Sequence, residues 1–202
     1  MSQFEFFMAF YGLLLGLAVA ELLGGFANLL RERAQPKWGV LLPLVALLIL
    51  VEISATFIDT WVKLQGININ LVEFGLPALI GIFYFIAAVI AFPRHLEDWP
   101  SLTDYFLARR YWIVGLLIAA NLGHFITEIP FVQKAAAEGN PGLIGYILRN
   151  LLLFATYIVL MVSRRVAVSI AALAVLLGFF AYIYGVQAML AGGWTIAGSP
   201  AG

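Results

Sequence analysis

The sequence predicts an all-α integral membrane protein, built as a bundle of six transmembrane helices. Two features of its composition lead to this fold class: 63% of the 202 residues are hydrophobic and only 11% are charged. A soluble domain carries about 25% charged and about 45–50% apolar residues. The third observation is that the apolar residues gather in six segments, each close to the roughly 20 residues that a helix needs to cross a bilayer.

The composition also excludes several classes of function. Because 11 basic residues balance 11 acidic ones, the chain lacks the basic surface of a nucleic-acid-binding protein, and no nucleic acid is expected as a partner. The chain contains no cysteine, which excludes disulfide frameworks, thiolate nucleophiles and cysteine-ligated zinc or iron–sulfur sites. No motif implies a cofactor, so none is predicted.

The six spans form one transmembrane domain over residues 1–202 and are separated by polar breaks. We place them at about 6–30, 38–62, 71–92, 111–130, 141–161 and 166–191. The longest break, 93–110, contains Ser101-Leu-Thr-Asp104, a capping box that predicts a short interfacial helix through Phe106. Gly139-Asn-Pro-Gly142 is a turn signal before the fifth span. Only Ser163-Arg-Arg165 separates the last two spans, which predicts an antiparallel hairpin.

Basic residues gather on one side of the predicted membrane. Eight lie in the breaks after the first, third and fifth spans: Arg31, Arg33, Lys37, Arg94, Arg109, Arg110, Arg164 and Arg165. Only Lys63 and Lys134 lie on the opposite side. Since cytoplasmic loops are enriched in lysine and arginine, we expect a multi-pass protein of the bacterial inner (plasma) membrane, with both termini on the outer, periplasmic side.

Small residues recur at regular spacing in three spans. They are Gly12, Gly16, Ala20 and Gly24 in the first span, Gly115, Ala119 and Gly123 in the fourth, and Gly178 and Gly185 in the sixth. Such patterns let a second helix approach closely. We expect these faces to pack within the bundle, with an oligomer seam on the sixth span as the alternative.

The candidate functional residues are polar side chains inside the spans, because an unpaired charge at the bilayer centre costs at least about 2.5–3.5 kcal/mol. They are Glu21 in the first span, Glu52 and Asp59 in the second, Asn121, His124 and Glu128 in the fourth, and Arg149 in the fifth. Helical spacing puts those of the second span on one face, and likewise those of the fourth. We expect these seven residues to face one another as a polar lane from the outer side to mid-membrane.

Each residue of the polar lane has an expected role. Glu21 and Glu52 fall near the midplane and have one intramembrane arginine, Arg149, to share, so at least one is expected to be protonated or ion-bound. Asn121 and His124 would line the path. Asp59 and Glu128 would form its outer mouth. The inner half is poorer in polar groups, which is typical of either a gated path or a dead-end pocket.

The predicted function is the passage or exchange of protons, or of a small ion or solute, through the polar lane. The alternative is a non-catalytic accessory, assembly or scaffold subunit of a larger membrane complex, whose partners besides the lipid bilayer would be its own copies or other membrane subunits. No catalytic residue is predicted. His124 and Glu128 are weak candidates for a metal site, because imidazole and carboxylate suit several divalent metals but no second histidine lies in a span. His95, Glu97 and Asp98 could serve a lipid-modifying enzyme, although nothing in the sequence fixes their geometry.

Overall fold

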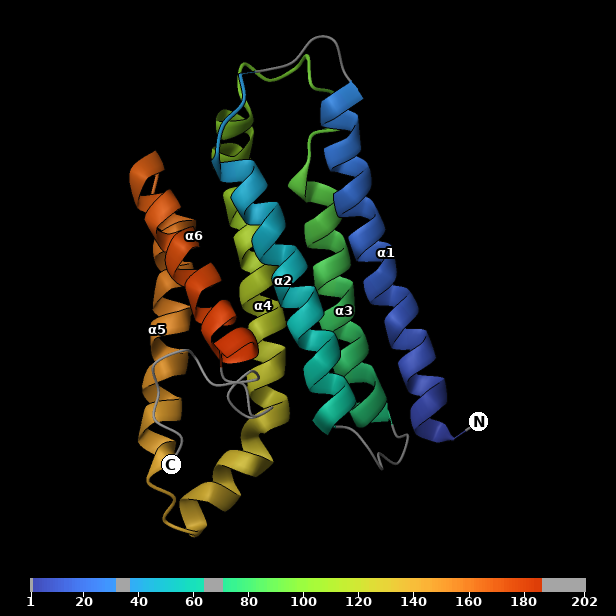
Figure 1. Ribbon diagram of the computed structural model, residues 1–202, viewed down its shortest axis with the longest axis vertical. Helices are drawn as coiled ribbons and strands as arrows, with labels where there is room; N and C mark the ends of the chain where they lie inside the picture. The colour runs from blue at the N-terminus through green and yellow to red at the C-terminus, as the bar shows by residue number, and fades with distance from the viewer. Residues whose placement is uncertain (1, 32–36, 64–70, 187–202) are drawn as a thin grey trace, which may run out of the picture.

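The computed structural model describes residues 2–31, 37–63 and 71–186, and it is helical throughout these ranges apart from short connections (Figure 1). The helices are α1 (Gln3–Arg31), α2 (Leu41–Lys63), α3 (Leu71–Ala91), α4 (Leu102–Ala137), α5 (Gly142–Val162) and α6 (Val166–Phe180), which continues as the π-helical segment η1 (Ala181–Val186). Six helices in the described ranges are long and apolar enough to cross a membrane. This confirms the all-helical class and indicates a multi-pass membrane protein.

The helices form a bundle in which α2 and α4 occupy the middle (Figure 1). The most extensive contacts join α3 to α4 and to α1, while α5 packs on α4 and on α6. α2 contacts α1, α3, α4 and α6. The two helices with the most polar residues in their spans therefore each pack against several other helices.

The bundle is apolar both inside and on much of its outer surface. Its core includes Leu42, Leu48 and Ile49 of α2, all with no exposed surface. Large apolar side chains also cover the outer faces of α1 and α5, where Leu13 and Leu151 are about two-thirds exposed, at 66% and 65%. Exposed apolar surface on this scale is unfavourable in water and suits contact with lipid.

Helix α4 is longer than the sequence predicts. The expected interfacial helix and the fourth span, placed at 111–130, are one helix that begins at Leu102 and ends at Ala137. Ser101 is confirmed as the N-cap residue, since its hydroxyl accepts a hydrogen bond from the Asp104 backbone N–H at 3.0 Å. Helix α4 bends towards its C-terminal end (Figure 1). This part contains Pro130, and proline removes a backbone donor and is the usual cause of such a bend.

The ends of α1, α3 and α5 lie together at what we call the basic end, marked by Lys37, Arg94, Arg109, Arg164 and Arg165. Arg110, counted with these residues from the sequence, points into the bundle and is 5% exposed. Its Nε donates to the carbonyl oxygen of Met161, near the end of α5, at 3.0 Å. Arg110 therefore satisfies one of the carbonyls that a helix leaves unpaired at its C-terminus.

The prediction that the small-residue faces pack within the bundle is wrong at most positions. Gly16 and Gly24 are exposed, and a Cβ added at either, or at Gly178 or Gly185, would meet nothing within 4 Å. Ala20 is exposed as well, and a Cβ at Gly12 would make only an ordinary contact, 3.6 Å from Phe57. Gly16, Ala20 and Gly24 therefore lie on the exposed side of α1. Residues 187–191 of the sixth predicted span lie outside the described residues.

The prediction is confirmed at Gly123 of α4, where an added Cβ would lie 2.6 Å from Cγ1 of buried Ile80 in α3. We expect Gly123→Ala to destabilise the protein by about 1–3 kcal/mol, the usual cost of overpacking a core. The matched control is Gly115→Ala on the same helix, where the added Cβ meets nothing within 4 Å. Thermal unfolding in detergent compares them, and equal melting temperatures for the two variants would contradict this packing.

Candidate functional site

The site is built around Glu52, which lies midway along α2 and has no exposed surface. Its carboxyl group accepts three hydrogen bonds from three other helices. The Tyr157 hydroxyl of α5 donates to Oε1, and Oε2 accepts from Nδ2 of Asn121 in α4 at 2.8 Å and from the Tyr84 hydroxyl of α3 at 3.2 Å. Glu52 thereby joins α2, α3, α4 and α5 at one point.

The donors around Glu52 are hydroxyl and amide groups rather than cations. Within the described part of the chain, Glu52 makes no ion pair. The second hydrogen of the Asn121 amide is also used, by the carbonyl oxygen of Leu117 at 2.9 Å. No cation among the described residues neutralises the carboxyl, and each tyrosine hydroxyl can donate to its ionised form or accept from its protonated form.

A chain of hydrogen bonds leads from His124 to Glu52. Nε2 of His124 lies 2.8 Å from Oγ1 of Thr56, and that hydroxyl donates to the Tyr84 hydroxyl at 3.3 Å. The Tyr84 hydroxyl in turn donates to Glu52. Since the single hydrogen of Thr56 points to Tyr84, His124 must be the donor to Thr56. All three bonds therefore point towards the carboxyl, and we call His124, Thr56, Tyr84 and Glu52 the hydrogen-bond chain.

The hydrogen-bond chain begins at a polar cavity of about 160 Å³ between α2, α4, α5 and α6. This volume has room for roughly five waters at about 30 Å³ each. Its polar lining comes from Thr56, Asp59, Tyr84, Asn121, His124, Glu128, Tyr146, Arg149, Asn150 and Tyr184. Five of the seven residues of the polar lane line this cavity. A sixth, Glu52, is hydrogen-bonded to two residues that line it, Tyr84 and Asn121. Glu21 is the exception.

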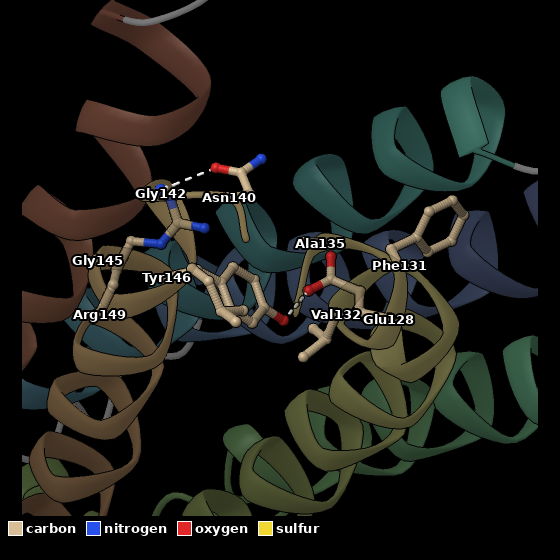
Figure 2. A pocket seen from close by; sticks show the side chains of 10 residues that line it. Glu128, Phe131, Val132, Ala135, Asn140, Gly142, Gly145, Tyr146 and Arg149 are labelled. Atoms are coloured by element: carbon tan, nitrogen blue, oxygen red, sulfur yellow. Dashed lines mark hydrogen bonds between the residues drawn. The ribbon is translucent and has the colours of Figure 1, made fainter. Parts of the chain in front are cut away.

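Two carboxylates that line the cavity are each bonded to a tyrosine. Asp59 of α2 accepts from the Tyr184 hydroxyl at 2.9 Å, and Glu128 of α4 accepts from the Tyr146 hydroxyl of α5 (Figure 2). The Arg149 guanidinium carbon lies 5.4 Å from the centre of the Tyr146 ring. Glu128, Tyr146 and Arg149 also line a second, wider cavity of about 690 Å³ between α4 and α5, so the two cavities adjoin at these residues.

The expectation that Glu21 faces the polar lane is wrong. Glu21 is exposed on α1, whose buried stripe runs through Tyr11, Leu15, Ala18 and Leu22. At 100° per residue, Glu21 lies on the flank of that stripe rather than in it. The acidic pair expected at mid-membrane is therefore a single buried carboxyl, that of Glu52.

On the other side of Glu52, towards the basic end, the bundle is packed with apolar side chains. Leu48, Ile49, Ile113, Val114 and Leu117 have no exposed surface. Few polar side chains lie in this half of the described bundle: Asn28 is exposed, Thr156 bonds back to Leu152 of its own helix at 2.8 Å, Tyr157 belongs to the Glu52 cluster, and Ser169 of α6 is buried. In this conformation the polar lane therefore ends at Glu52.

Sequence reasoning gave the tyrosines no role at the site, although Tyr84, Tyr146, Tyr157 and Tyr184 each donate to one of its carboxyl groups. Tyrosine in membrane proteins gathers at the ends of spans, and a buried tyrosine hydroxyl usually has a hydrogen-bond partner. The position of Tyr84, well inside its predicted span at 71–92, was therefore an available signal, whereas Tyr157 lies only four residues from the end of its predicted span at 141–161.

The metal alternative gains no support from the geometry. Among the described residues, no group of three or more histidine, aspartate or glutamate side chains is placed to hold a metal ion. His124, Glu128 and Asp59 line the same cavity, but among the described residues they are not grouped closely enough to hold a metal ion together.

No protein-family model, curated protein or solved structure that was compared with the chain matches it. The fold and the site define a class only: a helical protein with six helices capable of spanning a membrane and a buried carboxyl beneath a polar cavity.

We expect loss of one donor to Glu52 to destabilise the bundle. Tyr157→Phe removes only the hydroxyl and should lower stability by about 1–3 kcal/mol, the cost of leaving a buried acceptor short of a partner. Tyr182→Phe is the control, because Tyr182 is 57% exposed. Thermal unfolding in detergent measures both, and a Tyr157→Phe protein as stable as the control would show that the contact contributes nothing.

Proposed function

We propose that this protein conducts or exchanges protons across a membrane through the polar lane, with Glu52 as the group that takes up and releases the proton. The observation that carries the proposal is the hydrogen-bond chain, which connects a polar cavity with a fully buried carboxyl. Ionisable side chains inside transmembrane segments are typical of ion pathways and proton relays. A small ion or solute is the second candidate for the transported species.

The direction of the hydrogen bonds specifies how a proton would move. A proton from cavity water binds Nδ1 of His124, and the proton on Nε2 passes to the Thr56 oxygen. Thr56 releases its own hydrogen to the Tyr84 oxygen, and Tyr84 releases its hydrogen to Oε2 of Glu52. One proton enters at His124, one arrives at Glu52, and each hydroxyl ends with one hydrogen. His124 is left as the neutral tautomer that carries its hydrogen on Nδ1.

The remaining lane residues support this role from the lining of the cavity. Asp59 and Glu128 place two carboxyl groups there, and Arg149 adds a guanidinium group. These groups keep the cavity polar and attract protons and small cations to it. Exit towards the basic end requires the apolar packing beyond Glu52 to open, so we propose alternating access rather than an open channel.

The proposal includes a location and an orientation. Basic residues mark one end of the bundle, and the positive-inside rule would place that end in the cytoplasm of a bacterial inner membrane. The cavity would then open towards the periplasm, together with both ends of the chain.

A separate observation favours the accessory-subunit alternative. Glu21 lies on the exposed side of α1, and Gly16, Ala20 and Gly24 are exposed on the same helix. A carboxyl group facing lipid is costly, and small residues let another helix approach. A second copy of the chain or another membrane subunit would cover both features.

Proton movement is tested in liposomes that contain the purified protein and a pH-sensitive dye. Under an imposed pH gradient we expect wild-type protein to change the internal pH faster than empty liposomes do, and Glu52→Gln to reduce the rate to that of empty liposomes. Glu97→Gln, which alters an exposed loop carboxyl, should behave as wild type. If wild type moves no protons under any gradient, the proposal fails and the accessory-subunit alternative takes its place.

A pair of threonine variants tests the hydrogen-bond chain itself. Thr56→Val keeps the side-chain shape but breaks the chain between His124 and Tyr84, so we expect proton flux to fall to a small fraction of that of wild type. Thr156→Val removes a hydroxyl that bonds only within α5 and should leave flux unchanged. Equal flux in the two variants would mean that protons do not travel through Thr56.

A further inference from the structure

A third cavity, unrelated to the polar lane, lies at the basic end of the bundle. It has a volume of about 660 Å³ and lies between the end of α3, the segment 92–101 and the first turns of α4. Its lining includes the charged side chains of Arg94, Asp98 and Arg109. We call it the α3/α4 groove.

The groove changes from charged to apolar along α4. Tyr105, Arg109, Trp112 and Leu116 all line it, and their spacing of three or four residues puts them on one face of the helix. From Arg109 to Leu116 the helix rises about 10 Å, and Ile86 of α3 lines the groove as well. The groove therefore has a cationic rim and an apolar floor that continues towards the middle of the bundle.

Aromatic side chains flank the rim. Trp99 packs edge-on against Tyr105, with ring centroids 5.0 Å apart, and the Tyr105 hydroxyl donates to the carbonyl oxygen of Ile90 at 2.8 Å. This bond ties the start of α4 to the end of α3 and fixes one wall of the groove. Trp112 is 67% exposed. Tryptophan and tyrosine favour the level of lipid headgroups, which places the rim at that level.

The two arginines of the rim are available to a ligand. Arg94 and Arg109 are exposed, and neither makes a hydrogen bond or ion pair with another described residue. The adjacent Arg110 differs, because it bonds to Met161 inside the bundle. Asp98 is the one carboxylate in the lining. Nδ1 of His95, which also lines the groove, lies 3.8 Å from Oε1 of Glu97, and Glu97 itself does not line the groove. Two guanidinium groups against one carboxylate leave the rim with an excess of positive charge.

We propose that the α3/α4 groove binds one anionic glycerophospholipid, with its phosphate between Arg94 and Arg109 and an acyl chain along the apolar floor. Guanidinium groups bind phosphate oxygens in a bidentate geometry, and basic pockets between transmembrane helices accept anionic headgroups. A free phosphate ion would match the rim but leave the floor uncovered. A zwitterionic lipid would match the floor but gain less from the rim.

The test is a lipid titration of the purified full-length chain in detergent, followed by thermal unfolding. Phosphatidylglycerol should stabilise the protein at concentrations about tenfold lower than phosphatidylcholine with the same acyl chains, since basic residues near the membrane attract anionic lipid. Inorganic phosphate and glycerol phosphate should give no stabilisation at the same concentrations. If phosphatidylglycerol has no advantage, or if either soluble phosphate reproduces its effect, the lipid site is refuted.

Variants locate the effect in the groove. The double variant R94Q/R109Q should lose the preference for phosphatidylglycerol, whereas R164Q/R165Q, which removes two arginines outside the groove lining at the same end, should keep it. Equal losses in the two double variants would indicate general attraction of lipid to the basic end and would overturn the site.

A fluorescence measurement does not depend on the stability of the arginine variants. Phosphatidylglycerol with brominated acyl chains should quench tryptophan emission of the wild-type protein more strongly than brominated phosphatidylcholine. The double variant Trp99→Phe/Trp112→Phe, which removes both tryptophans that line the groove, should remove most of this difference. A difference that persists in the double variant would place the bound lipid elsewhere.

Discussion

The structure depends on how an apolar bundle accommodates the carboxyl group of Glu52. Placing a charged side chain at the centre of a membrane helix costs about 2.5–3.5 kcal/mol on insertion scales. Hydrogen bonds to a charged group contribute about 1.5–3 kcal/mol each, and Glu52 receives three of them, from Tyr84, Asn121 and Tyr157. The donors are sufficient to hold the ionised carboxyl, and they can also remain in place around a protonated one. This tolerance of both states is what a proton-exchanging group requires.

The same interaction connects the fold with the proposed function. Three helices donate to one side chain of a fourth, so the cluster fixes the register of α2 against α3, α4 and α5. The polar cavity lies on one side of this cluster and the apolar core on the other. A change in the charge of Glu52 would alter the strength of bonds to three helices at once. Protonation is therefore coupled to helix packing, which alternating access requires.

The helices, their order and the polar face of α2 could be predicted from the sequence because they follow from local hydropathy and helical spacing. The second and fourth spans carry their polar residues at three- and four-residue intervals, and those residues meet in the structure. The orientation of Glu21 could not be predicted, because it depends on which side of α1 packs against α3. The full length of α4 was missed because Arg109 and Arg110 interrupt the hydropathy between the predicted interfacial helix and the fourth span. The roles of Tyr84 and Tyr146 depend on how side chains of neighbouring helices meet, which hydropathy does not specify.

The most direct test of the account is infrared difference spectroscopy on the protonation of Glu52 in membranes. We expect a pH step on the cavity side to change a carboxyl C=O band that is absent in Glu52→Gln, and we expect this change to be slowed or lost in Thr56→Val. A carboxyl band of Glu52 that does not respond to pH on either side would contradict the account, because a group that never exchanges its proton can only be structural.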